Sequence, residues 1–180
     1  MWYGGKWVVF NPPDVPAGYI TRPNMTIDAK SKEAQLEKQE VSLQDALALV
    51  EDAAPDVRRA ALWFVGQRGV LEQHNDSATH KRVASCLTDK NDDVRRAAAW
   101  ALSRLGVGGD KEIAALVKER LAKDRDPAVR IHLVRAVQCG GASSGASWST
   151  LLEMVAMEDP DVWVRGAAAT VPHATHKSRL

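Results

Sequence analysis

Tryptophan and arginine recur at helical spacing in the segment DVRRAAAWALSRLG, residues 93–106, where binding chemistry is the function they could serve. Trp100 follows Arg96 by four residues and precedes Arg104 by four, which places the three side chains on one face of a helix. Tryptophan buries a large flat surface and arginine makes several directed hydrogen bonds, so both dominate binding hot spots. The segment therefore predicts a contact surface for a partner.

The same pattern recurs along the chain. Four segments align: APDVRRAALWFVGQRG, NDDVRRAAAWALSRLG, DPAVRIHLVRAVQCGG and DVWVRGAAATVPHATH. Their Val-Arg pairs begin at Val57, Val94, Val129 and Val164, so the intervals are 37, 35 and 35 residues. A fixed period of this length is the signature of a repeat architecture.

Each repeat is expected to contain two helices. In the segment 94–105, Val94, Ala98, Ala101, Leu102 and Leu105 recur at helical spacing and are expected to face the core, with Arg96, Trp100 and Arg104 pointing away from it. A second helical pattern precedes each Val-Arg pair. Asp110 is expected to cap one such helix and Ser42, in a capping-box-like sequence, another, while residues 77–88 give the weakest helical pattern. The glycines at 69, 106 and 140–141 are placed where they could end the second helices.

Helix, turn and helix at a period of about 35 residues predict an all-α fold, an α-solenoid of about four helical hairpins with an extended N-terminal arm. The pattern D-P-x-V-R-x-x-A-A-x-A-L-x-x-L-G resembles HEAT repeats, specifically the short HEAT-like repeats named after phycobilisome lyases. The resemblance covers residues ~42 to 172 and departs from the pattern at Ile131-His132-Leu133 and at Gly166, which is expected to interrupt the last helix. It implies that the side carrying the second helices is concave. It also implies a ladder in which the first arginine of each pair links neighbouring repeats through the Asp or Asn four residues before it, as in Asn91/Arg95, Asp126/Arg130 and Asp161/Arg165; Ala54 breaks the pattern before Arg58.

Stacked repeats would align Trp63, Trp100 and Arg135 in one stripe. The alternative is that the two tryptophans stack on each other or lie beneath the N-terminal arm. This arm holds half of the chain's aromatic residues and several prolines, which favour an extended segment docked on a surface, either of its own solenoid or of another subunit. The predicted partner-binding residues are Arg59, Trp63, Arg96, Trp100, Arg104 and Arg135 in the repeats and Trp2, Trp7 and Phe10 in the arm.

Three regions are therefore expected: an arm and linker over residues 1–40, a HEAT-like repeat domain over 41–172 and a tail over 173–180. The five histidines form no HExxH motif, and there is no GxSxG motif, P-loop or dinucleotide fingerprint. Cys86 and Cys139 belong to no CxxC or Cys/His cluster. We therefore expect neither an enzyme, nor a metal site, nor a cofactor.

The amino-acid composition of the chain limits the kinds of partner that it is expected to bind. The 24 Lys and Arg residues against 23 Asp and Glu leave a formal charge of +1, which argues against a general attraction to nucleic acid. No apolar run approaches the roughly 18 residues of a membrane span, although peripheral association with a membrane complex is compatible with the sequence. We expect an intracellular protein, cytoplasmic or organellar, noting that a removed transit peptide would leave no trace.

The leading hypothesis is a non-enzymatic protein–protein interaction module, a small accessory or stabilising subunit of a larger assembly. Two alternatives stay open. The resemblance permits a bilin lyase-like chromophore-protein chaperone, and the arginines at 59, 96, 104 and 135 could bind nucleic acid.

Overall fold

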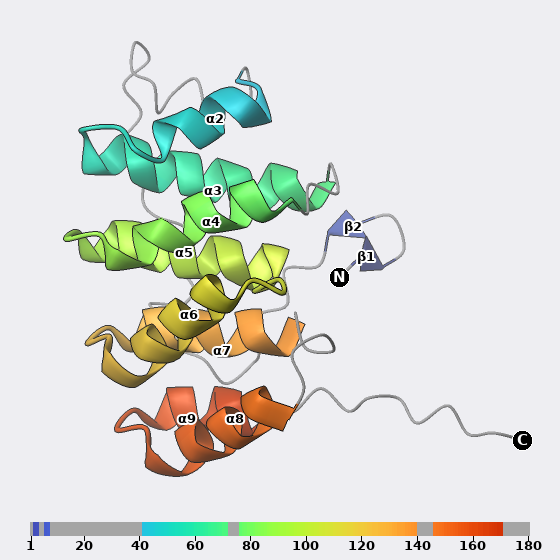
Figure 1. The fold of residues 1–180 in the computed structure, drawn as a ribbon, viewed down its shortest axis with the longest axis vertical. Helices are drawn as coiled ribbons and strands as arrows, with labels where there is room; N and C mark the ends of the chain where they lie inside the picture. Colours follow the sequence, from blue (N-terminus) through green and yellow to red (C-terminus); the bar gives the residue numbers. More distant parts are fainter. Residues whose placement is uncertain (1, 4–5, 8–40, 72–75, 140–145, 171–180) are drawn as a thin grey trace, which may run out of the picture.

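The computed structural model describes residues 2–3, 6–7, 41–71, 76–139 and 146–170, and its described helices form four successive antiparallel pairs (Figure 1). The pairs are α2 (Leu43–Leu49) with α3 (Pro55–Leu71), α4 (Ser77–Ser85) with α5 (Asp92–Leu105), α6 (Lys111–Lys123) with α7 (Pro127–Cys139), and α8 (Ala146–Glu158) with α9 (Val162–Ala169). A short 3-10 helix, η2 (Cys86–Thr88), follows α4. The predicted all-α solenoid of about four hairpins is confirmed.

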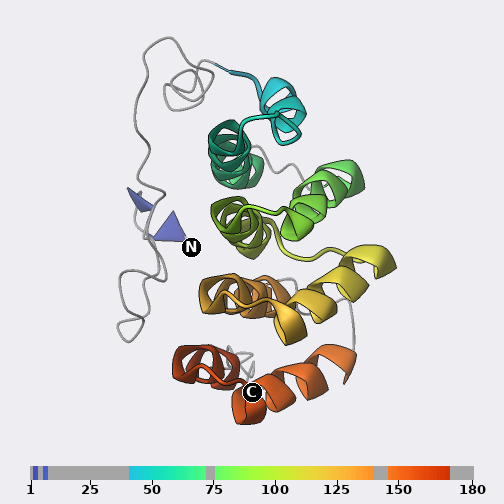
Figure 2. The ribbon, with the colours of Figure 1, turned by 90° about the vertical axis from the view of Figure 1, so that its left-hand side faces the viewer.

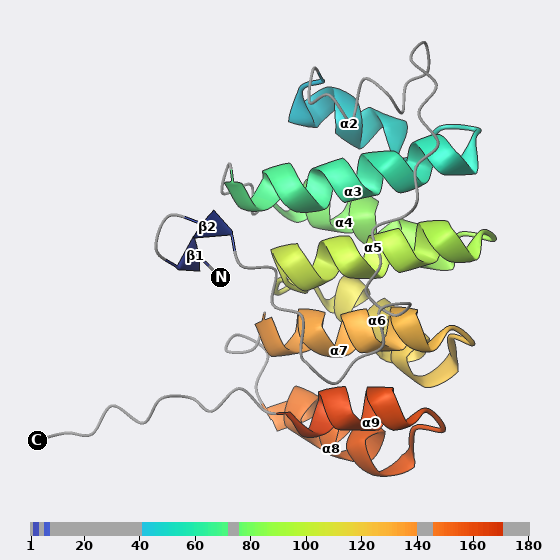
Figure 3. The same ribbon diagram turned by 180° about the vertical axis from the view of Figure 1, so that it is seen from behind.

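The helices stack in two layers (Figure 2). The first helices of the hairpins, α2, α4, α6 and α8, lie on one side, and α3, α5, α7 and α9 form what we call the second-helix layer, which faces the viewer in Figure 3. Within this layer α3 contacts α5, α5 contacts α7 and α7 contacts α9. Positions that repeat along the sequence are thereby brought next to each other on one surface.

Two predicted helix starts are confirmed. The Ser42 side chain accepts the amide of Asp45 at the start of α2, and the Asp110 side chain accepts the amides of Glu112 and Ile113 at the start of α6. These bonds satisfy backbone donors that have no partner inside the helix. The α5 helix ends at Gly106, whose φ of 86° is a backbone conformation that favours glycine.

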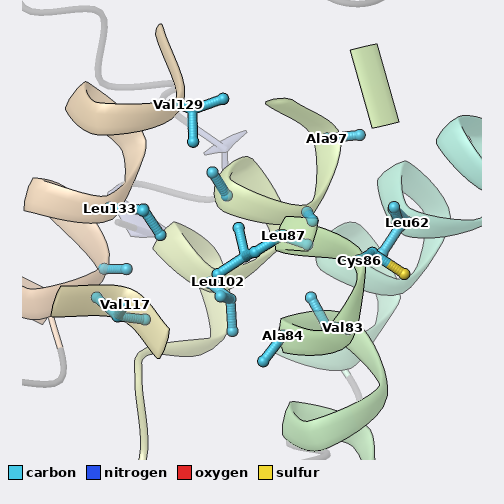
Figure 4. Packing of buried hydrophobic residues seen from close by; sticks show 14 of the residues in the cluster. Leu62, Val83, Ala84, Cys86, Leu87, Ala97, Leu102, Val117, Val129 and Leu133 are labelled. Carbon is cyan, nitrogen blue, oxygen red and sulfur yellow. The ribbon is translucent and has the colours of Figure 1, made fainter. Parts of the chain in front are cut away.

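The core lies between the two layers. Val94, Ala98, Ala101 and Leu102 are all fully buried, and Leu105 is half-buried against the same cluster, which confirms the predicted core face of α5. Figure 4 shows Leu102 among side chains from both layers, including Val83, Leu87 and Val117. One apolar cluster extends across all four hairpins, so each hairpin buries its apolar face against its neighbours.

Two glycines that were expected to end or interrupt a helix lie inside one. The α3 helix continues through Gly69 to Leu71, and α9 continues through Gly166. A Cβ at Gly69 would lie 2.8 Å from Cδ2 of Leu105, so a larger residue there would displace the Leu105 side chain. The glycines at 140–141 lie outside the described residues.

In the arm, β1 (Trp2–Tyr3) pairs antiparallel with β2 (Lys6–Trp7), with Trp2 opposite Trp7. Phe10, the rest of residues 8–40 and the predicted tail at 173–180 lie outside the described residues.

Candidate partner-binding face and inter-repeat ladder

Two tryptophans stack across neighbouring repeats on the second-helix layer. The rings of Trp63 on α3 and Trp100 on α5 have centroids 3.6 Å apart and planes 22° apart. Both side chains are half-buried, and part of Trp100 packs against the core cluster. The guanidinium of Arg104 lies 5.9 Å from the centre of the Trp100 ring, within the range of a cation–π contact. The position of Trp100 in its helix predicted a side chain that points away from the core. The structure corrects this prediction, because part of Trp100 packs against the core cluster.

A glycine makes room for this stack. A Cβ at Gly66 on α3 would lie 2.5 Å from Cζ3 of Trp100 and 3.0 Å from the backbone of Ala101. The indole of Trp100 therefore occupies space that any other residue at position 66 would fill. This close approach keeps α3 and α5 together while both tryptophans stay partly exposed.

We expect Gly66→Ala and Gly166→Ala to have opposite effects on stability. Alanine is preferred to glycine in a helix interior by about 0.5–1 kcal/mol. At Gly166 nothing lies within 4 Å of an added Cβ, so that gain should appear in full. At Gly66 overpacking costs about 1–3 kcal/mol, so the net free energy of unfolding should fall. Urea denaturation of both variants measures the difference, and a stabilised Gly66→Ala variant would contradict the packing described here.

A small hollow lies beside the stack. It is lined by Arg59, Trp63, Asp93, Arg96, Trp100 and His132, which come from three successive second helices. His132 was not among the predicted site residues. It stands where the repeat usually has a small side chain, and it is 3% exposed at the bottom of this hollow.

The arginines of this face differ in their charge compensation. Arg59 pairs with Asp56 at 3.3 Å, and Arg96 pairs with Asp126 at 2.6 Å and with Asp93 at 2.7 Å. Carboxylates already neutralise these two guanidinium groups. The structure therefore gives less support to the alternative in which the arginines of this face bind the phosphates of a nucleic acid. Their side chains are held in place for contacts at the hollow.

Arg135 occupies on α7 the repeat position that Trp100 occupies on α5. Its environment differs from that of Arg59 and Arg96. Burial lowers the pKa of both Arg135 and Arg104, and Cys139 offsets part of that effect. Within the described part of the chain, Nη2 of Arg135 is buried without a hydrogen-bond partner. A buried guanidinium edge that lacks an acceptor is costly. Arg135 as a whole is half-buried, so a carboxylate that reached the accessible part of its side chain would pair with an uncompensated charge.

A second feature of the layer is a regular ladder of ion pairs between repeats. Arg58, Arg95 and Arg130 bind the carboxylates of Asp89, Asp124 and Asp159, respectively, each located in the turn inside the next hairpin. The Nε–carboxylate distances are 2.7, 3.0 and 2.8 Å. Burial would lower the pKa of Arg95, but hydrogen bonds to Asp124 and Asp92 raise it overall.

Each ladder arginine also binds its own hairpin. Nη1 donates to a backbone carbonyl six residues earlier, at 2.8 Å for Arg58, 2.9 Å for Arg95 and 2.6 Å for Arg130. One guanidinium thus joins the turn of its own hairpin to the turn of the next. This double attachment fixes the offset between neighbouring hairpins.

The ladder corrects the pairing that the resemblance implied. Asn91 and Asp161, four residues before an arginine, cap the helices α5 and α9 instead. Asp126 accepts the amide of Ala128 and pairs with Arg96, the second arginine of the preceding repeat. Ala54 does not break the ladder, since Arg58 still binds Asp89.

The carboxylates that bind the ladder arginines follow a pattern that is visible in the sequence. An aspartate stands six residues before each of the four arginines, and these are Asp52, Asp89, Asp124 and Asp159. Their intervals of 37, 35 and 35 residues equal those of the Val-Arg pairs. A period shared by two residue types indicates an interaction that repeats with the fold.

The part of the chain that the structure describes holds neither a metal site nor a membrane span. No group of His, Cys, Asp and Glu residues in the described ranges could hold a metal ion. Among the helices that the structure describes, none is both long and apolar enough to cross a membrane.

The stacked hairpins, the continuous core and the arginine ladder define an α-solenoid repeat protein. The sequence profile of the HEAT repeats matches residues 43–138, which is more than half of the chain. The chain therefore belongs to the HEAT-repeat family. HEAT repeats generally mediate protein–protein interaction and are typically not enzymes. No curated protein matches the chain.

Proposed function

We propose that this chain is a non-enzymatic protein–protein interaction module, a small accessory or stabilising subunit of a larger assembly. The partner would bind the second-helix layer at Arg59, Trp63, Arg96, Trp100, Arg104 and Arg135, with Trp2, Trp7 and Phe10 of the arm adding contacts. The repeat domain over 41–172 would be the rigid part and the arm over 1–40 an extension of the contact surface.

The observation that carries this proposal is the partly exposed Trp63–Trp100 stack next to α7, where no described carboxylate pairs with Arg135. A flat aromatic platform offers apolar area, and it is held rigid by the stack, so little conformational entropy is lost on binding. A guanidinium without an intramolecular acceptor offers a directed, charge-assisted bond. Such a combination suits a protein segment that presents an apolar side chain and a carboxylate.

We expect Arg135→Glu to weaken association with the partner by about 2 kcal/mol or more, roughly 30-fold, the size of a hot-spot effect. The melting temperature should be retained, because no described carboxylate pairs with Arg135 and none would lose its partner. The measurement is quantitative co-purification of the tagged full chain from native extract, with cross-links mapped by mass spectrometry.

Lys123→Glu makes the same charge change on α6, in the layer of first helices, where the Lys123 side chain is 72% exposed. Co-purification should survive in this control. If the Arg135→Glu variant recovers as much partner as the unaltered chain, and the cross-links are confined to α4 and α6, the partner binds elsewhere.

A further inference from the structure

The ladder has an open end at the last hairpin. Arg165 on α9 occupies the fourth arginine position and donates from Nη1 to the carbonyl of Asp159 at 2.7 Å, as the other ladder arginines do to their own turns. Arg58, Arg95 and Arg130 also bind a carboxylate from the following hairpin. Among the described residues, no carboxylate pairs with Arg165.

The surface around Arg165 is also uncovered. By the 35-residue offset, Gly166 and Ala169 on α9 correspond to Ile131 and Val134 on α7, which are both fully buried. Gly166 and Ala169 are exposed, and an added Cβ at Gly166 would meet nothing within 4 Å. The positions that a following hairpin would cover are thus small, apolar and open to solvent.

Exposed large apolar side chains gather on the same hairpin. In the described ranges they are Val162, 60% exposed, on α9 and Met154 and Met157, 46% and 71% exposed, on α8. A terminal repeat needs a polar outer face if nothing covers it. This end of the stack has the composition of an internal repeat.

The opposite end differs. On α3 of the first hairpin, Ala60 and Phe64 are 2% and 5% exposed, and the exposed residues of the preceding α2 include Gln44 and Asp45. Among the described residues, the first hairpin therefore presents no open apolar face that could receive α9 of a second copy. The occupant of the open end is therefore not the first hairpin of another copy.

We propose that the outer face of α8 and α9 binds a helical repeat of a partner protein, which places an aspartate against Nε and Nη2 of Arg165 and covers Val162, Gly166 and Ala169. The three inner steps of the ladder define this partner chemistry, because each pairs the same guanidinium edge with an aspartate in a hairpin turn. Residues 171–180, which follow α9, contain no Asp or Glu. The proposal rests on the proposed function of protein binding but concerns a different surface.

The test is a chimera in which residues 1–170 are followed by a copy of residues 101–139. Val164 and Val94 are 70 residues apart, so Thr170 corresponds to Trp100 and the copy continues the repeat in register. The copied Asp124 then follows Arg165 by the same 29 residues that separate it from Arg95. We expect the copied hairpin to fold onto α9, to raise the melting temperature and to slow hydrogen exchange of the α9 amides.

The matched control is the same chimera with the copied Asp124 replaced by Asn. It leaves residues 1–170 unaltered, and the added protection of the α9 amides should fall by about tenfold through loss of the charge-assisted bonds. An appended hairpin that stays unprotected, or protection equal in the Asp and Asn forms, would overturn the proposal.

Sedimentation of the unaltered full chain tests the choice of occupant. A monomer over the micromolar range supports a partner protein. A dimer that dissociates on Arg165→Glu would mean that a second copy covers the end and would overturn the assignment. Arg135→Glu affects neither experiment, so this proposal can fail while the proposed second-helix interface stands, and the reverse.

Discussion

Replacing Asp124 by alanine should lower the free energy of unfolding by about 3 kcal/mol, the cost of removing one partner from a buried ion pair. The Asp124 side chain is 1% exposed, and Arg95, its partner in the preceding hairpin, is 7% exposed. Without this carboxylate the Nε of Arg95 keeps its burial and loses its acceptor. The expected value is at the low end of the range for buried pairs, because Asp92 still pairs with Arg95 at 2.8 Å. Urea denaturation followed by circular dichroism measures the loss.

Two comparisons separate the ladder from a general charge effect. Glu119→Ala removes an exposed carboxylate that pairs with Lys123 at 3.7 Å, and it should change stability by less than about 1 kcal/mol. The double variant Arg95→Met with Asp124→Leu should be more stable than Asp124→Ala, because no unpaired charge stays buried. If Asp124→Ala unfolds like Glu119→Ala, the ladder contributes nothing to stability.

Trp100→Ala should destabilise the isolated fold by about 3 kcal/mol, the low end of the range for losing a buried aromatic side chain. The loss includes the stack on Trp63 and the contact over Gly66, and the partial exposure of Trp100 keeps it from being larger. The hollow beside the stack would open at the same time. Thermal and urea denaturation of the variant test this directly.

Trp100→Phe is the matched control, since it keeps an aromatic ring against Trp63, and it should cost less than about 1.5 kcal/mol as a swap of similar shape. Because the stack also forms the proposed platform, Trp100→Ala should reduce co-purification of the partner as well. A Trp100→Ala protein with unchanged stability and lost association would mean that the indole serves the partner alone.

The sequence alone determined the features that arise from local spacing. The period of the Val-Arg pairs, the core face around Val94, Ala98 and Leu102, and the caps at Ser42 and Asp110 are all confirmed. The core face follows from the 3.6-residue period of one helix, and the caps follow from hydrogen bonds that span three residues or fewer; the period of the Val-Arg pairs is read directly from the repeated sequence. Such interactions are formed within a single element and do not depend on how the hairpins stack.

The tertiary structure decided which side chains meet across repeats. The ladder pairs lie 29 to 31 residues apart, and the arginines bind aspartates in the next turn because stacking brings that turn, and not the nearer cap residue, to the guanidinium. The stack of Trp63 on Trp100 depends likewise on Gly66, whose missing Cβ sets how closely α3 and α5 approach. A glycine in a helical pattern looks the same in the sequence whether it ends a helix or admits a neighbour. Gly66 and Gly69 admit side chains of α5 close to the absent Cβ, and such a close approach is a property of the packed molecule.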